Sequence, residues 1–133
     1  MIKNSLLTKN NKTTKSIIIA NINYRQMKSY ILIHELAGSR IVVHCDDVKL
    51  QRLLTSLGFI KEQNDFFIKK VDTEQQRIHI IKNLMKNYQV LFADGQDWCP
   101  AQLILYYRDQ GIINGKIKII SWQNQHKYKI IEE

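Results

Sequence analysis

Short β-branched runs alternate with helical patterns along this chain, and this alternation constrains the fold more than any other feature. Residues 16–22, 30–36 and 40–45 are rich in isoleucine, leucine and valine and are separated by polar segments. Runs of this length and composition are typical of β-strands. A glycine-containing break at 37–39 predicts an antiparallel hairpin over 30–45. Further strands are expected at 66–71, 90–93, 117–122 and 128–131.

The first expected helix lies between the third and fourth of these strands. Asp46 and Asp47 precede apolar residues at helical spacing, and Gly58 follows the last of them. An aspartate side chain accepts hydrogen bonds from the free amides of a helix start, and glycine adopts the left-handed conformation that often ends a helix. These signals predict a helix over 48–57.

Two more helices are expected further along the chain. Asp72 or Thr73 is the expected N-cap of the second, because apolar residues recur three or four apart over 78–88. Pro100 is the expected first residue of the third, since proline fits the first helical turn, and Gly111 is its expected stop.

The resulting element order, β-β-β-α-β-α-β-α-β-β, defines the expected fold class. Three helices interleaved with short strands favour an α+β two-layer domain with a mixed, mainly antiparallel sheet. An Asn-Gly pair at 114–115 predicts a hairpin within 112–117. Residues 16–133 are expected to form this single domain. Residues 1–15 carry four lysines and few large apolar groups, so we expect a flexible basic tail there.

Composition supports a folded, soluble protein. Hydrophobic residues make up 44% of the 133 residues and charged residues 24%, with only 1 proline and 5 glycines. These proportions exclude collagen-like, low-complexity and wholly disordered chains. No apolar run approaches the roughly 18 residues of a membrane span. The first residues lack the apolar stretch of a signal peptide, so we expect a cytoplasmic protein without membrane association.

The net charge of +8 is distributed unevenly. Residues 1–45 hold seven basic residues and one acid (+6), residues 46–100 hold eight of each (0), and residues 101–133 hold five and three (+2). A basic excess of this kind suits a polyanionic partner, although lysines also keep an isoleucine-rich protein soluble.

The final strands contain the most suggestive binding feature. Strand alternation predicts one hairpin face that combines lysines with an aromatic ring. Lysines neutralise phosphates, and an aromatic ring stacks on an unpaired base, so this face is the expected nucleic-acid-binding site. The structural alternative is an edge hairpin that lysines protect from strand addition. The expected site residues are Lys116, Lys118, Trp122, Lys127 and Lys129.

The segment from Asp94 to Pro100 carries the enzyme hypothesis. A strand-to-helix junction with two aspartates and a thiol is a common location for active sites. Cys99 at the helix start would be the nucleophile. Its base would be a histidine, with His34, His44, His79 and His126 as candidates. The structural alternative is simpler: Asp97 caps the helix, Trp98 packs over it and Cys99 fills space.

Metal and disulfide chemistry have weaker support. Cys45 and Cys99 are the only cysteines, and neither has a second ligand at zinc spacing, so a disulfide scaffold and a structural zinc are not expected. Asp46, Asp47, Asp94 and Asp97 would hold Mg²⁺ only if the preceding strands were parallel neighbours.

The sequence thus favours a small non-catalytic binding protein with nucleic acid, DNA included, as its partner, and no cofactor is expected. A protein adaptor or inhibitor is the alternative within binding. A thiol- or metal-dependent enzyme centred on residues 94–99 is the alternative from another class. Phosphate-loop and dinucleotide motifs are absent from the sequence. The oligomeric state is left open.

Overall fold

The computed structural model describes residues 17–23, 30–95, 99–124 and 127–133. The expected tail at 1–15 lies outside these residues. The order of elements matches the expected alternation, with one short strand and one 3-10 turn (Gln63–Asp65) added. The strands are β1 (Ile17–Asn23), β2 (Ile31–Glu35), β3 (Arg40–His44), β4 (Ile60–Lys61), β5 (Phe66–Lys70), β6 (Val90–Ala93), β7 (Lys118–Asn124) and β8 (Lys127–Glu132).

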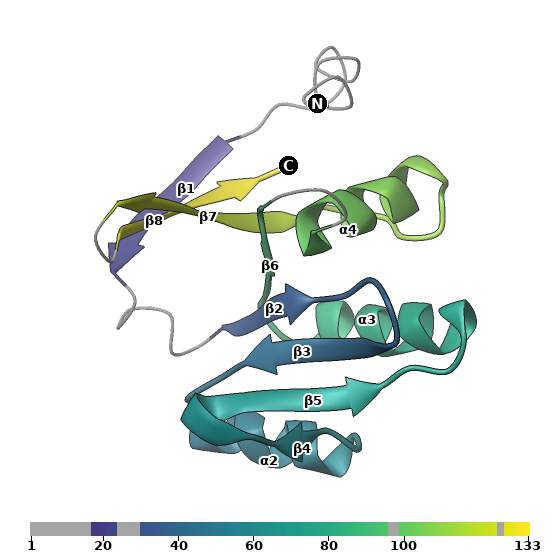
Figure 1. Cartoon of the computed structure of the whole chain (residues 1–133). Helices are drawn as coiled ribbons and strands as arrows, with labels where there is room; N and C mark the ends of the chain where they lie inside the picture. The colour runs from purple at the N-terminus through teal and green to yellow at the C-terminus, as the bar shows by residue number, and fades with distance from the viewer. Residues whose placement is uncertain (1–16, 24–29, 96–98, 125–126) are drawn as a thin grey trace.

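The eight strands form one mixed sheet in the order β1-β8-β7-β6-β2-β3-β5-β4 (Figure 1). Strands β2, β6 and β7 run parallel to one another in the middle of the sheet. The pairs on either side are antiparallel, including the hairpin of β2 with β3 that the sequence predicts. The fold is therefore α+β with a mixed, mainly antiparallel sheet, as expected.

Three helices cover one face of the sheet. They are α2 (Val48–Ser56), α3 (Glu74–Asn87) and α4 (Pro100–Asp109). Alternate strand residues such as Ile31, Ile33 and Phe92 pack with buried residues of these helices in the main core. The other face carries a smaller buried cluster of Leu32, Leu91, Ile120 and Ile130. Along the described ranges, none of the helices has the length and apolar content needed to cross a membrane.

Helix ends follow the capping signals in the sequence. Asp47 is the N-cap of α2, and its carboxylate accepts hydrogen bonds from the amides of Lys49 and Leu50 at 2.9 and 3.1 Å. Gly58 follows this helix with φ +97°, a conformation that residues with a Cβ rarely adopt. Thr73 caps α3 and accepts from the amide of Gln76. The first two helix predictions are confirmed.

The prediction of a hairpin at Asn114-Gly115 is wrong. Residues 112–117 are a non-strand connection between α4 and β7. The amides of Ile112 and Ile113 donate to the Tyr107 carbonyl, which ties this segment to the end of the helix. Ile117 instead exchanges two backbone hydrogen bonds with Glu133. The partner of β7 in a hairpin is β8, so the local Asn-Gly signal did not decide strand pairing.

Candidate nucleic-acid interface

The register of β7 with β8 separates the lysines that the sequence places on one face. Lys118 lies opposite Glu132, and Ser121 lies opposite Lys129. Opposite residues of antiparallel strands share a face, and side chains change face with each step along a strand. Lys118 and Lys129 therefore lie on different faces of the sheet. The prediction that four lysines share one hairpin face is therefore wrong. It assumed a register of β7 with β8 that differs from the one in the structure.

Trp122 and Lys127 are placed through their backbone. Trp122 pairs with Tyr128 and Lys127 pairs with Asn124, with a register shift between the two pairs. Their assignment as nucleic-acid contacts remains a prediction.

Lys116 precedes β7 and is 74% exposed. Its ammonium lies 3.7 Å from the Glu132 carboxylate. Because the lysine of this pair is open to water, which screens the charges, the pair contributes about 0–1 kcal/mol to stability. Lys116 is thus available to a stronger anionic partner.

Lys118 has a different environment. Its ammonium lies 5.8 Å from the centre of the Tyr30 ring. This geometry is a cation–π interaction, and it orients the lysine without neutralising its charge. Tyr30 is half-buried against the smaller cluster on the face away from the helices. The pair combines a positioned cation with an aromatic surface.

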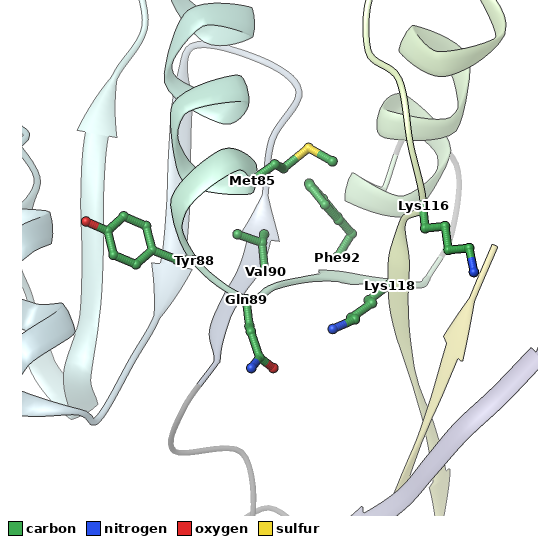
Figure 2. Close-up of a pocket in the computed structure, with 7 residues that line it drawn as sticks. All are labelled: Met85, Tyr88, Gln89, Val90, Phe92, Lys116 and Lys118. Atoms are coloured by element: carbon green, nitrogen blue, oxygen red, sulfur yellow. The ribbon is translucent and has the colours of Figure 1, made fainter.

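A pocket of about 180 Å³ adjoins this pair at the end of the sheet where β6 and β7 begin (Figure 2). Its apolar part consists of Val90 and Phe92 from β6 and Met85 from α3. Gln89 and Lys118 provide polar groups. Figure 2 shows Lys118 extending on the same side of β7 as Gln89, whereas Lys116 extends on the other side. The other two lining residues are Tyr88 and Lys116.

This arrangement suits an unpaired nucleotide. The half-buried side chains of Met85 and Tyr88 offer apolar surface to a base, an exposed amide such as Gln89 pairs with polar groups on a base edge, and a lysine contacts phosphate. Sequence analysis found Lys118 but missed Tyr30 and Gln89. These two residues directly precede β2 and β6, and the Ile31 amide donates to the Gln89 carbonyl at 2.9 Å. Only the parallel pairing of β2 with β6 makes them neighbours.

The fold places the described residues of the enzyme hypothesis on separate elements, with Cys99 at α4, His34 and His44 on β2 and β3, and His79 on α3. Cys99, rather than Asp97, is the N-cap residue of α4, and Pro100 follows it as the first helical residue. Asp97 and Trp98 lie outside the described residues. His34 and His44 lie in a ring cluster with Phe66, with ring centres 4.9 to 6.3 Å apart, on β2, β3 and β5.

Of the other two candidate bases, the structure describes one. His79 is an exposed residue of α3, and His126 lies outside the described residues. Cys99 is half-buried at the start of α4. A thiol role for Cys99 therefore remains a hypothesis.

The proposed magnesium ligands that the structure describes, Asp46, Asp47 and Asp94, lie at opposite edges of the sheet. Asp94 follows β6, while Asp46 and Asp47 follow β3. Strand β6 is parallel to β2 and β3 is antiparallel to it, so β3 and β6 end at opposite edges. Asp47 caps α2 instead. Within the described ranges, no three His, Cys, Asp or Glu side chains group in a way that could hold a metal ion.

A scan against models of protein families, a search of curated proteins and a search of solved structures found no match to this chain.

Proposed function

We propose that this protein binds single-stranded nucleic acid and places one nucleotide at the pocket beside Lys118. The observation that supports this most is the Lys118 ammonium positioned over the Tyr30 ring next to an apolar-lined pocket. The cation meets a phosphate, the ring offers a stacking surface, and Gln89 pairs with the base edge. The net charge of +8 attracts the polyanion to the molecule.

An unpaired strand is the preferred ligand in this proposal. Bases in a duplex are stacked and paired, so placing one in a pocket costs about a few kcal/mol. A single strand makes the same phosphate contacts without that cost. Lys116, Trp122, Lys127 and Lys129 extend the proposed contact region along the β7–β8 hairpin, on both of its faces.

Titration of fluorescent oligonucleotides at several salt concentrations tests the proposal. Lys118→Gln should flatten the slope of log K against log salt by about 0.7, because one phosphate contact is lost. Lys49→Gln removes the same charge from an exposed position on α2 and should leave the slope unchanged. Tyr30→Leu should weaken binding by about 1–3 kcal/mol with little change in slope, since it removes stacking.

Two results would contradict the proposal. Absence of binding to single strands and duplexes at low salt would eliminate nucleic acid as the partner and favour the protein-adaptor hypothesis. Equal effects of Lys118→Gln and Lys49→Gln would show that binding depends on net charge alone, without a site at the pocket.

A further inference from the structure

A second pocket lies between α2, β5 and α3, and it shares no lining residue with the Lys118 pocket. It has a volume of about 360 Å³, and its walls come from the end of α2, from β5 and from α3. This volume is within the range of about 300–1,000 Å³ that is common for small-molecule sites. The lining residues that carry the argument are Leu57, Lys69, Gln76, His79, Ile80 and Asn83.

Lys69 is the lysine in this pocket, and a glycine makes room for it. The Lys69 ammonium lies against Gly58, where an added Cβ would be 2.7 Å from Nζ. Gly58 also has φ +97°, so the backbone conformation at this position favours glycine, whereas the flexible tip of Lys69 can shift away from an added Cβ. The turn that follows α2 therefore lies against the side chain of the half-buried Lys69.

The Lys69 ammonium has no carboxylate partner in the part of the chain that the structure describes. None of the ion pairs there includes Lys69. No acidic side chain is among the described residues that line the pocket. A positive charge inside a pocket without carboxylates attracts an anion.

The remaining lining residues define the rest of the ligand. Leu57 and Ile80 provide apolar surface, while His79 and Asn83 provide polar groups. The Gln76 side-chain carbonyl accepts a hydrogen bond from the Asp72 amide at 2.7 Å, which leaves its NH₂ group as a donor. The pocket thus combines hydrogen-bond donors around the Lys69 ammonium with an adjacent apolar surface. This combination is complementary to a small anion that has an apolar body.

We propose that this pocket binds a small organic anion, whose carboxylate or phosphate group pairs with Lys69 and whose apolar body packs on Leu57 and Ile80. Gln76 and Asn83 donate hydrogen bonds to the anionic group through their side-chain NH₂ groups. The site is independent of the proposed nucleic-acid interface, because the two pockets share no lining residue.

Amide chemical shifts of the ¹⁵N-labelled full-length protein test this proposal. Benzoate and phenyl phosphate are the probes, and they distinguish a carboxylate from a phosphate as the preferred group. Benzyl alcohol, which is neutral and of similar shape, is the control. The anions should shift the amides of Leu57, Gly58, Lys69 and Ile80 in a saturable way, and benzyl alcohol should do so much more weakly.

Two variants assign the binding to Lys69. Lys69→Met keeps the apolar stem and removes the charge, so affinity for the anions should fall by about tenfold or more. Asn83→Asp is nearly isosteric at an exposed helix position and introduces a repelling carboxylate, so it should also weaken binding. It therefore tests the site even if Lys69→Met is unstable. Lys118→Gln should bind the probes as the wild type does.

The proposal is overturned if neither anion shifts these four amides, or if benzyl alcohol shifts them equally. It is also overturned if Asn83→Asp retains wild-type affinity, or if only Lys118→Gln loses the response. The last result would assign the anion to the other pocket. If the protein binds benzoate or phenyl phosphate but no oligonucleotide, the nucleic-acid proposal is contradicted and the small-anion proposal is not.

Discussion

At the scale of single residues, burial separates the two cysteines. Cys45 is 1% exposed, and its Sγ lies 3.9 Å from the Asp47 carbonyl oxygen. Burial, which disfavours the thiolate, raises the pKa of Cys45 to about 11. The thiolate is the reactive form, so Cys45 is chemically quiet at neutral pH. Cys99 is half-buried at the start of α4 and is more accessible.

Iodoacetamide should therefore label Cys99 faster than Cys45 in the native protein. Mass spectrometry of timed samples measures the two rates, and labelling in denaturant shows that both thiols react once unfolded. Equally slow labelling of both cysteines would remove the thiol-enzyme hypothesis. A thiol that iodoacetamide does not reach is also inaccessible to a substrate.

His34 carries a pH dependence of stability. His34 is exposed as a residue, but desolvation of its ring beside its neighbours, and then the nearby His44, lower its pKa below the ordinary value of 6.5, and Glu35 opposes this shift. Glu35 is itself held by Arg40 in an exposed two-bonded ion pair. The unfolded chain thus binds a proton at His34 more readily than the folded protein does. Neutral His34 therefore contributes its full stabilisation at pH values above the pKa that this histidine has in the unfolded chain. The contribution is lost as the pH falls from there through the lower pKa of the folded protein.

Thermal melting of the wild type should shift to lower temperature as pH falls from about 7 to about 5, and the shift should be smaller in His34→Gln. His79→Gln, which changes an exposed imidazole on α3, is the matched control and should retain the wild-type shift. An identical pH dependence in His34→Gln and the wild type would contradict this assignment.

At the scale of elements, helix α2 depends on its cap. It is nine residues long, and only Leu54 of its residues is fully buried. Isolated helices of this length are unstable in water, so terminal hydrogen bonds contribute strongly. Asp47 accepts two of them, and Gly58 adopts the left-handed conformation just past the end.

Asp47→Ala should lower the free energy of unfolding by about 0.5–2 kcal/mol. Asp46→Ala is the matched control, since it removes the same charge from the adjacent position. Asp46 makes no cap hydrogen bond in the described structure. Urea denaturation of both variants measures the difference. Equal losses would show that charge, rather than capping, is responsible.

At the scale of the whole molecule, one polar network joins three separate elements. The Glu74 carboxylate accepts from the Arg77 guanidinium and from the Tyr107 hydroxyl, which connects α3 to α4. Arg77 also donates to the Gly38 carbonyl in the turn between β2 and β3. Burial, followed by the Glu74 hydrogen bond, raises the pKa of Tyr107 to about 12, so the phenol stays a donor at neutral pH.

Tyr107→Phe should destabilise the protein by about 1–2 kcal/mol, because it removes a hydrogen bond to a charged group at a position only 1% exposed. Tyr106→Phe, at the adjacent position with 46% exposure, should have little effect. Urea denaturation compares the two. If Tyr107→Phe loses less free energy of unfolding than Tyr106→Phe does, the network adds nothing to the packing of α3 with α4.

The sequence by itself determined the identity and order of the three helices and of every described strand except β4. Helix α2 begins after Asp47 and ends before Gly58, as their chemistry predicts, and the hairpin of β2 with β3 follows from the break between them. These signals act between residues a few positions apart, so a local pattern contains them. The α+β class follows from the order of the elements.

Only the tertiary structure decided which distant strands are neighbours, and with them the candidate sites. Parallel pairing of β2, β6 and β7 brings Tyr30, Gln89 and Lys118 together from three separate parts of the chain. The register of β7 with β8 separates Lys118 from Lys129. Strand pairing depends on how the helices cover the sheet and fill the core, and a local pattern carries no information about either.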